Sequence, residues 1–375
     1  MTSAVILGMI VTMFTEARER TRAISLYSFV ASAGASIGLL AGGVLTEALN
    51  WHWIFFVNVP IGIVTAVLAL RLIEDDAGLG FADGIDALGA ILITAALMLG
   101  VLTIIRTSDV GWISAETLIG ALVTAATLGA FVLRETRTAN PLLPLRIFRS
   151  RALAGANAVM VLLVAGFFGT FFIGSLYLER VLGFDALEIG LGFLPVSLGI
   201  GVMSFVFAEP FITRFGPRAV LRTALLLLLI AMVWFARLSV GATYLVDVAP
   251  SLVLIGVGAG LAFPSIVGLA MSGATRDDAG VASGLVNTTR MVGGSLGLAA
   301  MASIATSRGA ALLSTGADRA TALTGGSQLA MVFAAVLMVG AIIVAWTVLG
   351  SGRSAAASSV DGDGSVEIEI LADAA

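Results

Sequence analysis

The sequence predicts an all-α, polytopic transmembrane helix bundle. Of its 375 residues, 59% are hydrophobic and 12% are charged, and the mean hydropathy is +1.06. Soluble domains have about 45–50% apolar and about 25% charged residues, so this chain cannot cover a water-facing surface with polar groups. Its apolar residues also fall into segments of about 20, which is the length that an α-helix needs to cross a bilayer.

The inventory of reactive side chains excludes several classes of protein. The chain has no Cys and a single His, His52, so disulfides, cysteine–metal sites and histidine metal clusters are excluded. All 20 basic residues are Arg, so neither a P-loop lysine nor a Schiff base can form. The formal net charge of -4 argues against a nucleic-acid partner. We therefore predict no enzyme activity, no catalytic residues, no bound metal and no cofactor.

Ten segments are long and apolar enough to be membrane-spanning helices. In chain order they are 23–45, 54–73, 87–105, 116–133, 152–177, 188–208, 219–236, 248–271, 280–304 and 328–349. Residues 1–14 are also apolar, but at about 1.5 Å per residue they reach only about 21 Å. We expect this stretch to be the second half of a helix whose first half is missing. The alternative is a short re-entrant or interfacial helix.

The arginines give the orientation of the helices. If the charged loop at 16–22 is cytoplasmic and the sides alternate, five arginines lie outside, Arg290 lies within a span, and fourteen lie inside: Arg18, Arg20, Arg22, Arg71, Arg134, Arg137, Arg146, Arg149, Arg151, Arg214, Arg218, Arg222, Arg276 and Arg353. This is the asymmetry that the positive-inside rule describes. It predicts a multi-pass protein of the plasma (inner) membrane with a cytoplasmic C-terminus, and an acidic, disordered tail at 351–375.

Small residues are concentrated in the first of the ten segments. Residues 32–43 read SAGASIGLLAGG, so that Gly34, Gly38 and Gly42 lie four residues apart on one helix face, with Gly43 beside them. Glycines at this spacing let two membrane helices approach backbone to backbone. The segment is either a surface for helix packing or, in a transporter, a pivot or seal.

Aromatic residues and prolines mark further positions. Trp51 and Trp53 bracket His52 at the outer end of a span, where indole rings favour the interface, and we interpret His52 as an interfacial side chain rather than a proton relay. Pro195 and Pro264 lie inside predicted spans. Proline leaves backbone carbonyl groups without their helical partner, which suits a kink or a gate.

Ionisable side chains near the spans are candidates for proton coupling, which needs a carboxylate inside the membrane. Glu179 and Glu209 are the candidate coupling carboxylates, but both fall near span ends, where interfacial or capping roles are the alternative. Arg290 is the deepest charge, about ten residues or roughly 15 Å into its span. With Asn287 it either lines an inner vestibule or latches two halves of the bundle, or it extends to the cytoplasmic surface.

Loop sequences suggest an internal repeat. An acid- and Arg-containing loop followed by a helix of small residues occurs at 15–38 and again at 274–297, six spans apart if the pair at 87–105 and 116–133 is set aside. Parallel repeats of this kind characterise one large transporter architecture. A third loop, EPFITRFGPR, turns the chain on the inner side and contains Arg214, Gly216 and Arg218.

These motifs together resemble the fourteen-span drug:proton antiporter branch of the major facilitator superfamily. The matching residues are ARERTRA (17–23), GLLAGGVLTEALNWHWIFFVNVPIG (38–62), DALGA (86–90), NPLLPLRIFRSR (140–151), YLERVLGFDALEIGLGFLP (177–195), RFGPR (214–218) and DAGVASGLVNTTRMVGGSLG (278–297). They cover nearly the whole chain in the family's order. The sequence departs from the family's pattern where Leu39 replaces a usual Pro and Glu179 a usual Gln.

The resemblance implies a major-facilitator fold that lacks its first three helices and half of the fourth. It divides the chain into the remainder of the N-terminal half (1–73), two linking helices (74–139), the C-terminal six-helix half (140–350) and the tail. The implied function is proton-driven export of drugs or other amphipathic small molecules.

The partners that the resemblance implies are the lipid bilayer and the amphipathic substrate, with a proton gradient as energy source and no obligate protein partner. Two alternatives remain. The chain could be a truncated fragment without transport activity, because alternating access needs two halves that move about one site. It could also be an uptake carrier for a small metabolite.

Overall fold

The computed structural model describes Ile6, Ile10, Met13, Phe14 and residues 16–72, 86–138, 140–275 and 278–349. All regular secondary structure in these residues is helical, as the sequence predicts. Most of the short apolar stretch at 1–14 lies outside the described residues, as do the 74–85 part of the linking region and the acidic tail.

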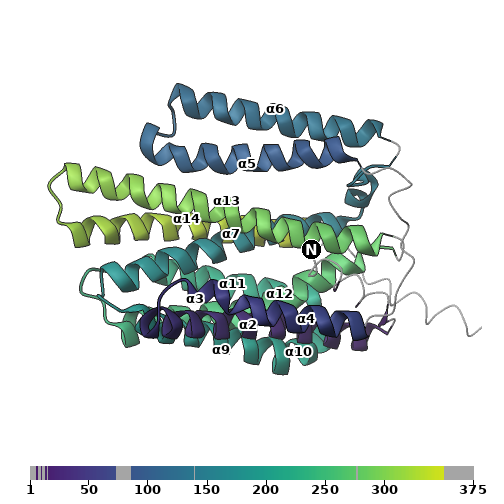
Figure 1. Cartoon of the computed structure of the whole chain (residues 1–375), viewed down its shortest axis with the longest axis horizontal. Helices are drawn as coiled ribbons and strands as arrows, with labels where there is room; N and C mark the ends of the chain where they lie inside the picture. The colour runs from purple at the N-terminus through teal and green to yellow at the C-terminus, as the bar shows by residue number, and fades with distance from the viewer. Residues whose placement is uncertain are drawn as a thin grey trace, which may run out of the picture.

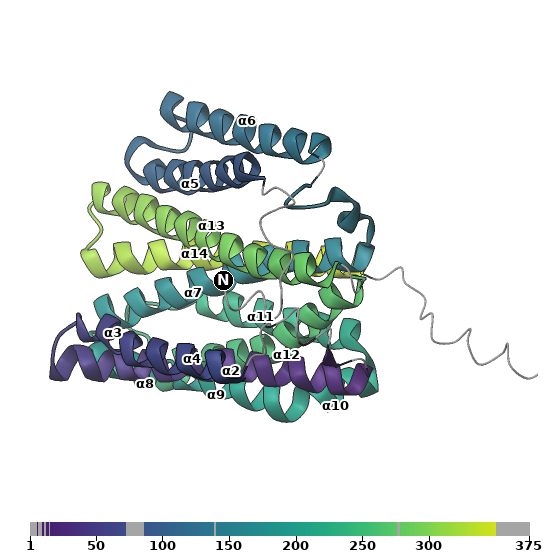
Figure 2. The same cartoon turned by 45° about the vertical axis from the view of Figure 1, so that its right-hand side comes forward.

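The first described helices lie along one side of the molecule (Figures 1 and 2). They are α2 (Ala17–Ala48), the short α3 (Trp53–Phe56) and α4 (Asn58–Leu72). Helix α2 packs against α8 (Ala186–Gly192), α9 (Leu194–Val202) and α12 (Ala249–Ser272) of the C-terminal region. Helix α4 exposes large apolar side chains, such as Leu70 with 85% of its surface exposed. A helix that is apolar all round is suited to lipid or to another helix and not to water.

Helices α5 (Ala87–Val110) and α6 (Ala115–Arg137) form an antiparallel hairpin. Asp86 caps α5 by accepting a hydrogen bond from the Gly89 amide, and Ser114 caps α6 in the same way through Thr117. Both views place this hairpin beyond α13, on the side of the molecule opposite α2 (Figures 1 and 2). The hairpin packs on α13, where the hydroxyl oxygens of Thr107 and Ser303 are 2.5 Å apart.

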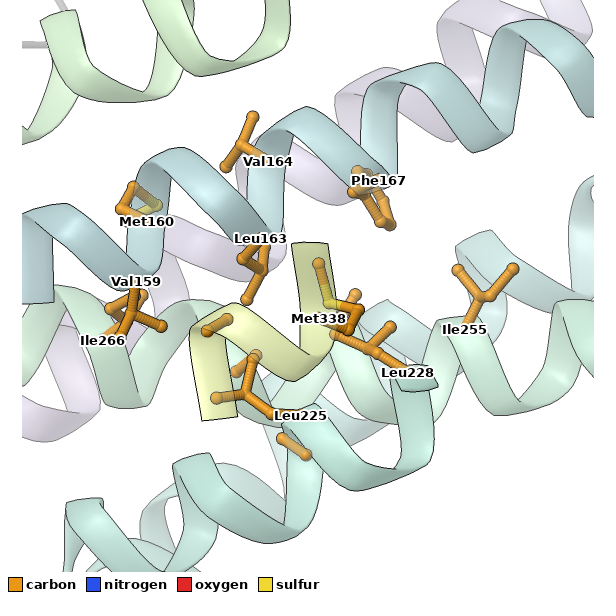
Figure 3. Close-up of a cluster of buried hydrophobic side chains, with 14 of the residues drawn as sticks. Val159, Met160, Leu163, Val164, Phe167, Leu225, Leu228, Ile255, Ile266 and Met338 are labelled. Carbon is orange, nitrogen blue, oxygen red and sulfur yellow. The ribbon is translucent and has the colours of Figure 1, made fainter. Parts of the chain in front are cut away.

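The C-terminal region is the densest part of the molecule. Its elements are η1 (Leu145–Arg149), α7 (Arg151–Arg180), α8 (Ala186–Gly192), α9 (Leu194–Val202), η2 (Met203–Phe207), α10 (Ala208–Phe215), α11 (Pro217–Phe235), η3 (Tyr244–Val248), α12 (Ala249–Ser272), α13 (Ala279–Ser314) and α14 (Arg319–Thr347). In Figure 3, Leu163 of α7, Leu228 of α11, Ile255 of α12 and Met338 of α14 meet in one apolar cluster. All four are buried, so α7 is held by several helices at once.

Helices α9 and α12 touch through their backbones. A Cβ atom on Gly256 would lie 2.7 Å from the Val196 carbonyl oxygen, and one on Gly260 would lie 2.6 Å from the Met203 Cβ atom. Nearby, the Ser204 hydroxyl donates to the Gly260 carbonyl oxygen at 2.9 Å. Glycine is therefore needed at these positions, because any side chain would separate the two helices.

The described helices confirm the predicted spans. Nine are long and apolar enough to cross a membrane, and each coincides with one predicted segment. The tenth segment, 23–45, lies within α2. The predicted segment 188–208 is not one continuous helix, because α8 ends at Gly192, Pro195 lies in the first turn of α9, and the π-helical η2 precedes α10. Proline cannot continue a helix from the preceding turn, since it lacks an N–H and its ring clashes with that turn. The protein is thus a multi-pass membrane protein.

Candidate functional site: a cavity between α2 and the C-terminal helices

A cavity of about 880 Å³ lies between α2 and the helices α10, α11 and α12. Its lining consists of Arg18, Arg20, Thr21, Ile24, Glu209, Pro210, Ile212, Thr213, Pro217, Pro264, Gly268 and Ser272. These residues lie at the ends of their helices that the arginine pattern assigns to the cytoplasm. The cavity therefore combines two guanidinium groups and one carboxylate with apolar walls. Such a lining suits an amphipathic molecule.

An ion pair closes one wall of the cavity. The Arg18 Nε atom in the first turn of α2 donates to the Glu209 Oε1 atom in the first turn of α10, at 3.2 Å. The Arg18 side chain is 83% exposed and that of Glu209 is 24% exposed. A pair this accessible to solvent contributes only about 0.2–1 kcal/mol to stability. We conclude that its main effect is to align α2 with α10.

The turn between α10 and α11 forms the edge of the cavity. Gly216 has a φ of +81°, which favours glycine, and its amide donates to the Ile212 carbonyl oxygen at 2.9 Å. The Arg214 guanidinium lies over the Phe215 ring, 5.3 Å from its centroid. Arg218 lies half-buried in the first turn of α11. The three predicted loop residues Arg214, Gly216 and Arg218 therefore lie beside the lining residue Pro217.

The two predicted gate prolines have different surroundings. Pro264 is buried inside α12 and lines the cavity. Pro195 lies in the first turn of α9, and its carbonyl oxygen would be 2.9 Å from a Cβ atom on Gly256 of α12. The structure therefore brings Pro264, but not Pro195, to the candidate site.

The glycines of α2 also divide into two groups. A Cβ atom on Gly43 would lie 3.0 Å from the Ala186 carbonyl oxygen at the start of α8, and one on Gly42 would be 4.0 Å from Ile54 of α3. A Cβ atom on Gly34 or Gly38 would meet no described atom within 4 Å. Among the described residues the close helix contact is thus at Gly43, which lies beside the face of Gly34, Gly38 and Gly42, and the role of that face stays a prediction.

Arg290 and Asn287 do contact each other, as their helical spacing suggested. The Arg290 Nη2 atom donates to the Asn287 Oδ1 atom at 3.2 Å, and the Arg290 Nε atom is buried without a hydrogen-bond partner in the described part of the chain. Both residues are on α13 and neither lines the cavity. Their predicted roles in a vestibule or latch stay predictions.

The two candidate coupling carboxylates lie at opposite ends of the bundle. Glu209 lines the cavity, whereas Glu179 is exposed in the last turn of α7, at the other end of the helices. Sequence reasoning did not identify Arg18 as the partner of Glu209, because the two residues are 191 positions apart. The charged run at 16–22 was the only signal that could have pointed to it.

A group of aromatic rings connects α7 with α8 and α12. The centroid of Phe171 is 4.9 Å from that of Phe167 and 4.8 Å from that of Phe193, and Phe167 is 5.6 Å from Phe263. Rings at these distances stabilise one another by about 0.5–1.5 kcal/mol beyond their burial. The group fixes α7 against the helix α12 that carries Pro264.

Comparison with known proteins decides the family. The sequence model of the Major Facilitator Superfamily matches residues 1–298, which is most of the chain. The chain belongs to the major facilitator superfamily. This confirms the family that the motifs suggested, whereas the fourteen-span branch and the missing N-terminal helices stay predictions.

Three relatives of this major facilitator protein carry names that refer to antibiotics. It is 33% identical to the puromycin resistance protein pur8 of Streptomyces alboniger, over 93% of this chain and 70% of that protein. It is 34% identical to the cephamycin export protein CmcT of Amycolatopsis lactamdurans, over 79% and 61% of the two chains. For the tetracenomycin C resistance and export protein of Streptomyces glaucescens the identity is 32%, over 76% and 53%. The chain thus spans about half to two-thirds of the length of these relatives.

Proposed function

We propose that this major facilitator protein exports antibiotics or other amphipathic small molecules, driven by a proton gradient, from the cytoplasm across the plasma membrane. Family membership supports transport, and three relatives at 32–34% identity are named for antibiotic resistance or export. The structural observation that carries the proposal is the cavity of about 880 Å³ between α2 and the C-terminal helices. In this proposal the cavity opens to the cytoplasm, where the C-terminus also lies.

Glu209 is the carboxylate that we propose for proton coupling at this cavity. It is partly shielded from water and bonds Arg18 across the gap between α2 and α10. Protonation of Glu209 removes its charge, so the Arg18 guanidinium loses its anionic partner and the attachment of α2 to α10 is weakened. Loss of the proton restores the ion pair. The proton on Glu209 and the separation of the two helices are thereby linked.

A transport assay tests this function. The protein is expressed in an efflux-deficient bacterial strain, and the accumulation of a fluorescent cationic dye and the resistance to puromycin, a cephamycin and tetracenomycin C are measured. We expect lower dye accumulation, and we expect a protonophore to abolish that effect. The Glu209→Gln variant should lose efflux on the order of tenfold or more, because its side chain cannot release a proton.

The control is Glu47→Gln, which makes the same chemical change at an exposed position of α2 outside the cavity. Efflux equal to that of the wild type is expected for this variant. Higher dye uptake on expression would instead indicate an importer. Protein that inserts into the membrane but changes neither accumulation nor resistance would show that the chain does not transport these compounds.

A further inference from the structure

Asp86 and Glu135 form a buried acidic pair at the inner end of the α5–α6 hairpin, on the side of the molecule away from the cavity. The Asp86 side chain has no exposed surface and Glu135 is 4% exposed. The Asp86 Oδ1 atom accepts from the Gly89 amide at 2.9 Å and from the Arg134 Nε atom at 3.1 Å. The Glu135 Oε2 atom accepts from the Leu143 amide at 2.8 Å.

The second oxygen of each carboxyl group has no partner. Asp86 Oδ2 and Glu135 Oε1 are both buried and make no hydrogen bond within the described residues. Both point to the same place, because a Cβ atom on Gly89 would lie 2.6 Å from Asp86 Oδ2 and 3.0 Å from Glu135 Oε1. Both oxygens therefore border the space that Gly89 of the DALGA sequence leaves open.

Charge balance requires one more positive charge at this pair. Two carboxylates and the single guanidinium of Arg134 together carry a net charge of -1. Like charges that are held together away from water destabilise each other. Another basic residue, Arg137, follows in the last turn of α6. A proton between the two free oxygens would neutralise the group and would satisfy both atoms at once.

The surrounding elements offer little other compensation. The segment that follows α6 carries Arg146, whose Nη2 atom bonds Asp278 at 2.9 Å, and Arg149, which is exposed. Helix α13, which packs against α5, carries Arg290 and Arg308 and no acidic residue. The Arg290 guanidinium bonds Asn287 of its own helix.

The two carboxyl groups lie at opposite ends of their helices. Asp86 lies at the N-terminus of α5, where the helix dipole favours an anion. The hydrogen bond from the Gly89 amide, assisted by that from Arg134, lowers the pKa of Asp86 despite its burial. Glu135 lies in the last turn of α6, where the dipole disfavours an anion, and its bonded oxygen accepts from a neutral amide only.

We propose that Asp86 and Glu135 form a proton-binding site, in which Glu135 holds one proton on Oε1 at neutral pH and donates it to Asp86 Oδ2. The proton comes from water on the inner side, and its binding breaks no covalent bond. Because Glu135 also accepts from the Leu143 amide, the site connects the proton to the segment that leads from the hairpin to α7. The inference does not depend on the proposed transport function.

Infrared spectroscopy of the purified protein tests for the proton directly. In difference spectra between neutral and alkaline pH, the wild type should show the carbonyl band of a protonated carboxyl group that disappears at alkaline pH. This band should be absent in Glu135→Gln, and also in Asp86→Asn, because without the Asp86 charge Glu135 is free to ionise. Asparagine still caps a helix, so the second variant should fold. The band should remain in Glu47→Gln.

Thermal unfolding at several pH values gives a second measurement. The folded wild type holds a proton that the unfolded chain releases, so its stability is complete at low pH and falls as the pair loses its proton. The Tm of the wild type and of Glu47→Gln should therefore fall as the pH rises from neutral to alkaline, while that of Glu135→Gln should change less.

The proposal would be overturned if the carbonyl band of a protonated carboxyl group (the acid band) and the pH dependence of the Tm were the same in Glu135→Gln and in the wild type. A wild type that shows no acid band at neutral pH would also overturn it. So would a Tm that responds to sodium concentration at fixed pH in the wild type and not in Glu135→Gln, since the occupant would then be a metal cation.

Discussion

Gly297 illustrates how single residues determine the distance between helices. A Cβ atom at this position would collide with the Cα and carbonyl oxygen atoms of Ala165 on α7, and one at Gly293 would lie 2.9 Å from the Val161 carbonyl oxygen. The backbones of α13 and α7 therefore touch, as small residues allow in membrane helices. On the same helix, a Cβ atom on Gly284 would meet no described atom within 4 Å.

The difference between these glycines leads to a matched pair of variants. Gly297→Ala should destabilise the protein by about 1–3 kcal/mol, because α13 must move away from α7 to admit the methyl group. Gly284→Ala should be neutral or slightly stabilising, because alanine favours the helix and the space is open. Thermal unfolding in detergent measures both. Equal melting temperatures for the two variants would contradict the close contact.

At the scale of elements, the α5–α6 hairpin is joined to the C-terminal region by a hydrogen bond between hydroxyl groups. The Thr107 hydroxyl donates to the Ile104 carbonyl oxygen at 2.6 Å, so the Ser303 hydroxyl is the donor in the 2.5 Å contact with Thr107. Both side chains are buried. The bond fixes where α5 lies along α13.

A double-mutant cycle with Thr107→Val and Ser303→Ala measures this bond. Interhelical hydrogen bonds in membrane proteins contribute about 0.6 kcal/mol on average and up to about 1.7 kcal/mol. We expect a coupling energy in this range from unfolding in detergent. Strictly additive effects of the two substitutions would show that the hairpin is held by apolar packing alone.

At the scale of the whole molecule, the arginine distribution assigns one end of the bundle to the cytoplasm. The cavity with Arg18 and Glu209, the acidic pair at Asp86 and Glu135, and the turn at Gly216 all belong to that end. Glu179 lies at the other end. Both proposed proton sites would therefore exchange protons with the cytoplasm.

The orientation can be tested with single cysteines, because the natural chain has none. Thr136→Cys on α6 and Ser314→Cys on α13 introduce thiols at exposed positions near opposite ends of the bundle. In intact cells a membrane-impermeant maleimide should label the Ser314→Cys variant, and Thr136→Cys should react only after permeabilisation. The reverse labelling pattern would place the C-terminus outside the cell.

Hydropathy was sufficient to predict the helices, because each span must satisfy its backbone internally and expose apolar side chains to lipid. Hydropathy alone did not give the division of 186–215 into α8, α9, η2 and α10, where Pro195 lies in the first turn of α9 and α9 contacts α12 through its backbone. The candidate site was predictable only in part. Glu209, Pro264 and the turn at Gly216 were identified, but the pairing of distant residues, Arg18 with Glu209 and Asp86 with Glu135, arises from tertiary structure.

Where α9 crosses α12, carbonyl oxygens of one helix face the glycine Cα atoms of the other, so there is no layer of side chains that could slide or compress. A widening of the cavity would therefore move these two helices as one body. Helix α2 meets this region through longer side chains, since the Phe29 ring contacts the Phe205 ring of η2, and Gly43 near its far end lies against the Ala186 carbonyl oxygen of α8. An opening of the cavity would thus turn α2 about its contact at Gly43, while α9 and α12 keep their mutual distance.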